Sequence, residues 1–453
     1  MKKIIALYAL LALVIFQTGC KKFVEGYDVS PNDPADVNIE VLLTGAQVAT
    51  FSNYTGNLAR LPAVLTNQLA GRQFQFEDFH QYVIRETALD NEFQQLYNGG
   101  MINAEQLISK AGDENKYYRG IGRVIKALNL GLATDMWGDV PNSEALRGLE
   151  GEAQFNPAYD AQEIVLRDIQ SSLDLAIQDF NSSDADNVKL PGEDDLIFGG
   201  DPVLWRNAAR ILKARYYNRL SKRDAAGSAN SALAVLDEAY ADGLSGSDGD
   251  MMAYFGEAAN EWNQWYAFEQ QRAGYLTMNQ FFLDLLVGDP RLPLYATANG
   301  DGTYDDQQPI GPYYSGLSSP LPLLTYFEAK FIEAEAALRV NNKARAASAY
   351  NEAVKANLGK LGVADPAYVA SHANETDATI TLEKIMTQKY VAMFTQPEVW
   401  SDWRRTNLPA LTPNAGATLT AIPRRITTPQ TERLYNTKAV VTSDILTPVW
   451  WDE

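Results

Sequence analysis

The chain has 453 residues, of which 46% are hydrophobic and 11% aromatic, so it has ample material for a folded core. One cysteine, Cys20, and two histidines, His80 and His372, exclude an internal disulfide, a thiolate zinc site and a multi-histidine metal site. Acidic residues outnumber basic ones 57 to 38, giving a net charge of −19, so we expect no nucleic-acid partner.

The first twenty residues have the layout of a secretory signal. Two lysines precede an apolar run over residues 4–16, which is too short to cross a bilayer as a helix. Thr18-Gly19 before Cys20 resembles the bacterial lipoprotein box, although Gln17 stands where an aliphatic residue is usual. We predict a signal peptide over residues 1–19, lipidation at Cys20 and a polar tether over 20–36. An ordinary secretory signal is the alternative.

Helical periodicity dominates the rest of the chain. Apolar residues recur every three or four positions over 166–180, 204–220 and 324–338. Asp201-Pro202 supplies an N-cap and a first-turn proline for the second of these helices, and Asp160 with Glu163 indicates a capping box for the first. Strand-like alternation of any length is absent from the sequence. We therefore predict a mainly α fold with a single domain over residues 37–453.

Two regions are typical of tetratricopeptide-like helix hairpins. Residues 205–240 have the right length, and residues 334–353 carry small and aromatic residues at the spacing of that repeat, with Asn341-Asn342 between the helices. The alternative is two ordinary antiparallel pairs in a larger helical bundle. Long irregular segments are predicted between the helices, and such segments are usually functional in a compact domain. They cover residues 181–200, 243–275, 288–322 and 408–436.

The densest aromatic segment lies within residues 243–275, where amide and carboxylate side chains alternate with the rings. This mixture suits a sugar, whose faces pack on aromatic rings and whose hydroxyls need planar hydrogen-bond partners, although a peptide would also fit. Core packing is the competing interpretation, because some of the rings must face inward. The predicted ligand contacts are Trp262, Asn263, Trp265, Tyr266, Tyr275, Tyr82 and Tyr304.

Neither catalysis nor a metal site is predicted. Residues 299–306 offer oxygen ligands that calcium would accept, but they lack the spaced glutamate of an EF-hand, so a solvated turn is favoured. The sequence contains no Gly-x-Ser-x-Gly elbow, Walker loop or HExxH helix. Carboxylate pairs for glycoside hydrolysis are inevitable among 57 acidic residues, and their availability is not evidence. We expect a protein that is not an enzyme and that needs no cofactor.

Seven short segments, in order behind the lipoprotein signal, carry a family resemblance. They are Tyr118–Gly120, Ala127–Pro141, Trp205–Asn207, Asp289–Leu292, Leu324–Ala337, Ile422–Arg425 and Val449–Asp452. Together they resemble the SusD/RagB-like outer-membrane lipoproteins, and among these the second SusD-like subgroup. The residues that contact ligand in that family cannot be matched to this chain position by position.

The resemblance implies a helical fold with tetratricopeptide-like units, no enzymatic activity, and a lipid-anchored protein of the outer membrane that faces the cell exterior. It also implies capture of an oligosaccharide or peptide and its delivery to a SusC-like TonB-dependent transporter. Residues 21–25 lack the acidic cluster that favours surface display in this family. The competing functions are a tetratricopeptide-type envelope scaffold that binds a protein or peptide, and a lipid-anchored glycoside hydrolase.

Overall fold

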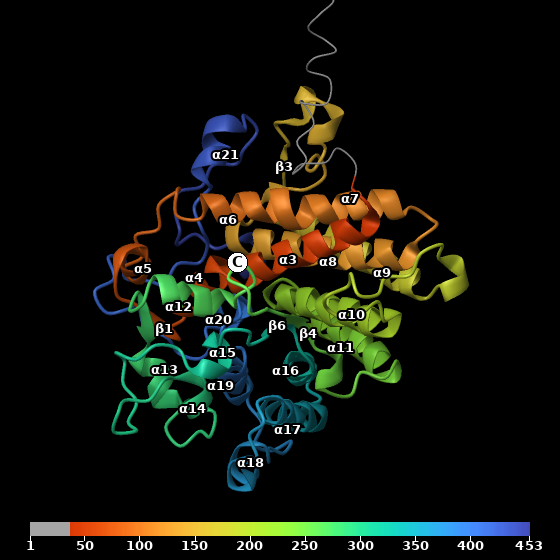
Figure 1. Cartoon of the computed structure of the whole chain (residues 1–453). Coiled ribbons are helices and arrows are strands. Elements are labelled where there is room, and N and C mark those ends of the chain that lie inside the picture. Colours follow the sequence, from red (N-terminus) through yellow and green to blue (C-terminus); the bar gives the residue numbers. More distant parts are fainter. Residues whose placement is uncertain (1–36) are drawn as a thin grey trace, which may run out of the picture.

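The fold is mainly α-helical, as the sequence predicts (Figure 1). The structure is a computed structural model that describes residues 37–453. The predicted signal peptide over 1–19, the predicted lipidation site Cys20 and the predicted tether over 20–36 lie outside the described residues. Within the described part of the chain, no helix is both long and apolar enough to cross a bilayer.

The first half of the described chain packs around two long helices, α3 and α8, which cross the upper part of Figure 1. Its elements are α3 (Ile39–Thr55), α4 (Asn57–Leu65), β1 (Leu69–Gly71), α5 (Phe74–His80), α6 (Asp90–Gln95), the π-helical segment η1 (Leu96–Met101), α7 (Ile102–Ala111), α8 (Lys116–Trp137), β2 (Val140–Pro141), β3 (Tyr159–Asp160) and α9 (Gln162–Phe180). A buried hydrogen bond from Asn129 Nδ2 to Thr50 Oγ1, 2.7 Å long, ties α8 to α3.

The second half places two more long helix pairs below the first half (Figure 1). Its elements are α10 (Pro202–Arg219), α11 (Ala225–Ala241), β4 (Met251–Ala253), α12 (Gln264–Gln271), β5 (Leu276–Met278), α13 (Gln280–Leu285), α14 (Leu292–Tyr295), α15 (Pro312–Ser315), β6 (Leu321–Leu324), α16 (Tyr326–Arg339), α17 (Lys343–Lys360), α18 (Pro366–His372), α19 (Leu382–Ala392), α20 (Glu398–Thr406) and α21 (Gln430–Tyr435). The short strands form three antiparallel pairs, β1 with β5, β2 with β3 and β4 with β6.

Three helix pairs form the tetratricopeptide-like part of the fold. The two predicted hairpins are α10 with α11 and α16 with α17, and Asn342 caps α17 as the second helix of its pair. The structure adds α8 with α9, whose helices are joined through a long connector over residues 138–161. Helix α9 packs on α10, and α11 packs on α16, so the pairs stack in chain order.

Two predicted helix starts have different outcomes. Asp201 caps α10 as predicted, since its side chain accepts hydrogen bonds from the Val203 and Leu204 amides at 2.8 and 3.1 Å. The capping box predicted at Asp160 is wrong. The Asp160 carboxylate accepts from the Ser143 amide at 2.7 Å instead. The first amide of α9 donates at 2.8 Å to Asp139, which lies at the start of the connector.

Three of the predicted irregular segments contain α-helices or strands. Residues 243–275 include strand β4 and helix α12, residues 288–322 include α14 and α15, and residues 408–436 include α21. These elements are three to eight residues long. Such lengths are too short for hydrophobic periodicity to reveal them.

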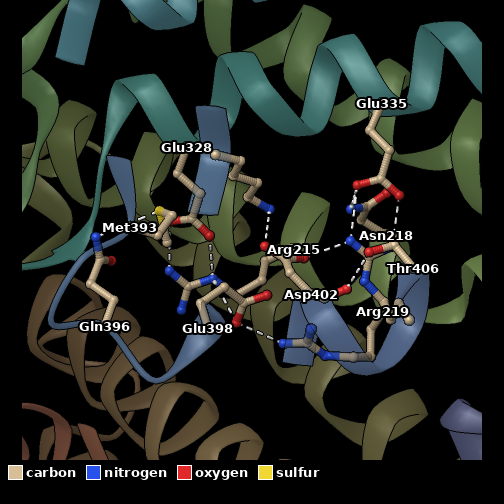
Figure 2. Close-up of polar contacts among 12 residues, drawn as sticks. Arg215, Asn218, Arg219, Glu328, Glu335, Met393, Gln396, Glu398, Asp402 and Thr406 are labelled. Atoms are coloured by element: carbon tan, nitrogen blue, oxygen red, sulfur yellow. Dashed lines mark hydrogen bonds and ion pairs between the residues drawn. The ribbon is translucent and has the colours of Figure 1, made fainter. Parts of the chain in front are cut away.

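Buried ion pairs join α10 to the C-terminal helices (Figure 2). Within this network, Arg215 binds Glu328 at 2.6 Å and Arg219 binds Glu398 at 2.7 Å. Further along α16, Glu335 binds Arg405 of α20 at 2.6 Å. All of these side chains are at least 95% buried. Removing one partner of such a pair leaves an uncompensated charge in the interior, so the network fixes how the helix pairs meet α20.

Candidate ligand-binding site

The predicted aromatic segment is organised by helix α12. Its N-cap is Asn263, whose side chain accepts from the Trp265 and Tyr266 amides at 2.8 and 3.0 Å. The same side chain donates to the carbonyls of Tyr314 and Ser319 at 3.1 and 2.7 Å. These four bonds use the whole amide group, and Asn263 is fully buried. Asn263 therefore positions α12 and lies out of reach of a ligand.

Two further predicted contact residues lie in the interior. Trp265 is 2% exposed, with its ring packed against the Arg60 guanidinium. Tyr82 is also 2% exposed, and its hydroxyl accepts from the Asn414 amide at 2.9 Å. Both rings belong to the hydrophobic core, because the chain around them leaves no surface open to a ligand. Their placement corrects the expectation that they contribute to the binding surface.

Three rings of the segment, Tyr254, Phe255 and Trp262, line a groove, whereas Tyr266 contacts Trp262 without lining it. Trp262 and Tyr266 stand edge to face with ring centres 5.4 Å apart, and the Trp262 Nε1 donates to the Glu257 carbonyl at 3.1 Å. Next to Trp262 lies a cavity of about 420 Å³ between the aromatic segment and α3, which we call the aromatic groove. It is lined by Trp262, Tyr254, Phe255, Gly256, Asn260, Glu261 and Gln264, by Thr44, Val48, Phe51 and Ser52 of α3, and by Leu196.

A second cavity, of about 360 Å³, adjoins the first, and Ser52 and Gln264 line both. We call it the polar cavity. Its lining is Ala49, Ser52, Asn53, Gly56, Asn57, Arg60, Glu92, Gln95, Gly99 and Gln264, from α3, α4, α6, η1 and α12. Burial lowers the pKa of the Arg60 guanidinium to about 9, against the opposing effect of Glu92. The two adjoining cavities thus place aromatic residues in the lining of one and mainly polar residues in the lining of the other.

A pair of stacked rings lies at the other end of α12. Phe74 and Tyr275 have ring centres 5.0 Å apart and planes inclined by 25°, and we call them the stacked pair. Phe74 is 68% exposed, and its backbone has a φ of 50°, a left-handed conformation that is an outlier for a bulky residue. Tyr275 is one of the predicted ligand contacts and Phe74 is not, although the sequence places Phe74 in a neighbouring aromatic cluster that could extend the same surface. No sequence signal reveals its left-handed backbone. Helix α5, which Phe74 begins, contacts α12 through Phe76 and Phe268.

The remaining predicted residue, Tyr304, is partly buried against the core and lines neither cavity. The carboxylates of the acidic turn at residues 299–306 are already bound by other groups of the protein. Asp301 accepts from the Thr303 amide at 3.0 Å, and Asp306 pairs with Arg72 at 2.7 Å. Among residues 37–453 no group of three or more histidine, cysteine, aspartate or glutamate side chains is arranged to hold a metal ion.

Another cavity, of about 440 Å³, lies on the far side of η1 and contains none of the predicted residues. Tyr97, Leu146 and Phe155 contribute to its apolar lining, and Glu432 is the one acidic or basic side chain among the described residues that line it. It is larger than the aromatic groove, but it does not adjoin the polar cavity through a shared residue. Both cavities combine aromatic rings with amide side chains. The aromatic groove is favoured because it includes the tryptophan Trp262 and adjoins the polar cavity.

Comparison with known proteins assigns the chain to a family. A family model described as SusD-like, starch-binding and associating with the outer membrane matches residues 31–429. The chain belongs to the SusD-like family. No curated protein matches this SusD-like chain. The match covers α3 to α20 and so includes the aromatic groove, the polar cavity and the stacked pair.

Solved structures share the fold of this SusD-like protein at low sequence identity. A chitin-binding SusD homologue from Flavobacterium johnsoniae is 23% identical, with a TM-score of 0.75 over 91% of this chain and 98% of that one. A chitin-binding protein is 21% identical, with a TM-score of 0.74 over 92% and 100% of the two chains. A SusD/RagB family protein from Bacteroides thetaiotaomicron is 20% identical, with a TM-score of 0.71 over 92% and 99%.

Proposed function

We propose that this SusD-like protein binds glycan oligomers along α12, at the surface formed by the aromatic groove and the stacked pair. The observation that carries the proposal is the groove itself. Trp262 and Tyr254 line it beside Asn260, Glu261 and Gln264, whose amide and carboxylate groups suit sugar hydroxyls. The family description as starch-binding and the chitin-binding structural relatives support a glycan as the ligand class.

Binding of starch-derived and chitin-derived oligosaccharides, measured by affinity electrophoresis and calorimetry on residues 21–453, tests this proposal. We expect Trp262→Ala and Phe74→Ala each to weaken binding at least tenfold, because an aromatic contact is lost in each. Phe155→Ala is the matched control, since Phe155 is 60% exposed but lines the other cavity. Full affinity in both site variants, or an equal loss in the control, would reject the surface.

We propose in addition that the protein is lipid-anchored at Cys20, faces the cell exterior, and passes its ligand to a SusC-like TonB-dependent transporter. The lipoprotein-like segment before Cys20 and the family description as associating with the outer membrane support this. Labelling with a radioactive fatty acid tests the anchor, and label that survives Cys20→Ala would contradict it. Purification from native membranes tests the partner. Recovery of the protein without a TonB-dependent transporter, under conditions that preserve envelope complexes, would count against delivery.

We propose that binding involves neither catalysis nor a metal ion. The family description names starch binding and no reaction. The carboxylates of the turn at residues 299–306 bind backbone amides of the same segment or the Arg72 guanidinium. Incubation with the glycans that bind should release no product, and dialysis against a chelator should leave affinity unchanged. Turnover of any bound glycan would favour a lipid-anchored glycoside hydrolase instead.

A further inference from the structure

Arg60 is a buried cation in the wall of the polar cavity. It lies on α4, is 5% exposed, and forms no ion pair with any of the described residues. Its Nη1 donates to Asn57 Oδ1 at 2.9 Å, and its Nη2 donates to the Gln264 carbonyl. A guanidinium has five N–H donors, and the Nε of Arg60 has no partner within the described chain. The Nε is itself buried, but Nη1 and Nη2 each donate only one of their two N–H groups within the described chain, so two donors remain unused on a side chain that lines the polar cavity.

Other buried arginines of the protein meet carboxylates. Arg215, Arg219, Arg291 and Arg405 are each within 2.7 Å of an aspartate or glutamate oxygen. Arg404 lacks such a partner, but it is stacked on Trp400 and Trp451 and lines neither the groove nor the polar cavity. Arg60 differs from all five because it lines the polar cavity and has no carboxylate within ion-pair distance in the described chain.

The surroundings of Arg60 hold its guanidinium in place for an incoming group. The rings of Phe268 and Trp265 lie 4.4 and 5.3 Å from its central carbon, which fixes the plane of the fork. Glu92 does not contact Arg60 directly. The side-chain amide of Asn57 lies between them, accepting from Arg60 and donating to Glu92 Oε1 at 2.6 Å. A planar, always charged fork of this kind is suited to bidentate binding of a carboxylate.

We propose that the polar cavity is a subsite for the carboxylate of an acidic sugar, a uronic acid residue, which Arg60 binds while neighbouring rings of the same glycan occupy the aromatic groove. The two hollows share Ser52 and Gln264, so one chain can lie in both. The net charge of −19 disfavours densely charged polyanions. The ligand class is therefore a glycan with isolated carboxylates among neutral rings. This inference rests on the proposed glycan-binding function.

The test compares each acidic oligosaccharide with its own methyl ester, which removes the charge and keeps the sugar. The probes are oligosaccharides that carry one galacturonate, glucuronate or mannuronate residue among neutral sugars, together with fully neutral oligosaccharides, and the readout is Kd by calorimetry. We expect at least one acid to bind about tenfold or more tightly than its ester, since a hydrogen bond to a charged group is worth more than one to a neutral group. Equal affinity for acid and ester in all three series, with neutral glycans still bound, would overturn this inference alone.

Two variants should move the acid-to-ester preference in opposite directions. Arg60→Gln should reduce it to near one, and Glu92→Gln should raise it several-fold, because a repelling charge next to the cavity is removed. Glu92 is only partly buried, so we expect Glu92→Gln to fold. Its acid-to-ester preference then tests the role of Arg60 even if Arg60→Gln unfolds. The matched control is Arg167→Gln, which replaces an exposed arginine of α9 and should leave the acid-to-ester preference unchanged. A lower preference in Glu92→Gln would overturn the assignment of Arg60. Failure of every glycan to bind would reject the proposed function together with the subsite.

Discussion

Replacement of Glu398 by glutamine tests whether the buried ion pairs hold the helix pairs to α20. Glu398 is 4% exposed, and its carboxylate lies 2.7 Å from Arg219 Nη2 and 3.8 Å from Arg215 Nε (Figure 2). Burial alone would raise the pKa of Glu398, but the two arginines hold it below its usual value. Glutamine keeps the shape of the side chain and removes the charge, so Arg219 retains only Asp135, at 2.8 Å, as a partner.

The expected cost follows from the burial of the pair. Breaking one partner of a buried ion pair costs about 3–5 kcal/mol. Unfolding of the 417 described residues carries an entropy of roughly 0.9 kcal/mol per kelvin, from about 2.1 cal/mol/K per residue. The melting temperature of Glu398→Gln should therefore fall by about 3–6 °C at pH 7. Scanning calorimetry and urea unfolding both measure this difference.

The same variant predicts a pH dependence with a definite sign. Because the folded-state pKa of Glu398 lies below its unfolded value near 4.5, the stabilisation is complete above that pH and is lost as the pH falls through the folded pKa. The stability gap between the wild type and the variant should thus shrink between pH 6 and pH 3. Glu150→Gln, in the exposed pair with Arg147, is the control and should change stability little. A gap that is absent at pH 7, or constant with pH, would refute the reasoning.

Two smaller predictions concern local packing. Asp201→Ala removes the N-cap of α10 and should lower the free energy of unfolding by about 1 kcal/mol, measured by urea titration, with Asp160→Ala as a comparison that leaves the start of α9 intact. Gly131→Ala places a methyl group against the Tyr216 hydroxyl in the contact between α8 and α10 and should cost about 1–3 kcal/mol, whereas Gly359→Ala, on an open face of α17, should cost nothing.

Helices with a long apolar period were predictable from the sequence, and their tertiary partners were not. The periodicity over 204–220 and the cap at Asp201 are local features, so both were predicted correctly. The start of α9 was missed because its first amide is bound by Asp139, which packs there only through tertiary structure. The pairing of α8 with α9 was missed for a similar reason, since a long connector separates the two helices.

The aromatic segment could not be interpreted fully from the sequence, because helix α12 was not predicted there. Once α12 is known, Trp265 and Phe268 lie three residues apart on it and face the core, whereas Tyr266 on the same helix and Trp262 just before it remain partly exposed. Sequence reasoning treated the segment as a loop and so could not divide its rings into two faces. The polar cavity lay beyond prediction, because Arg60 and Glu92 come from separate helices that only the fold brings together.

The left-handed backbone at Phe74 provides a final prediction, which separates strain from ligand contact. Phe74→Ala and Phe74→Asn both remove the ring and its stacking on Tyr275, so they differ mainly in how well the new residue tolerates a φ of 50°. Asparagine visits this region readily, whereas alanine pays about 1 kcal/mol or more to enter it. We therefore expect Phe74→Asn to exceed Phe74→Ala in unfolding free energy by about 1 kcal/mol in urea titrations.

Measuring the glycan affinity of Phe74→Ala and Phe74→Asn shows whether the ring at residue 74 contacts ligand or only contributes to folding. If the strained backbone serves to hold a ring out at the surface, both variants lose glycan affinity equally, even though one is more stable than the other. A residue selected only for folding would show the reverse, with affinity following stability. Equal stability of the two variants would mean that no strain is stored at residue 74. Retained affinity in both would remove the stacked pair from the binding surface and leave the aromatic groove to act alone.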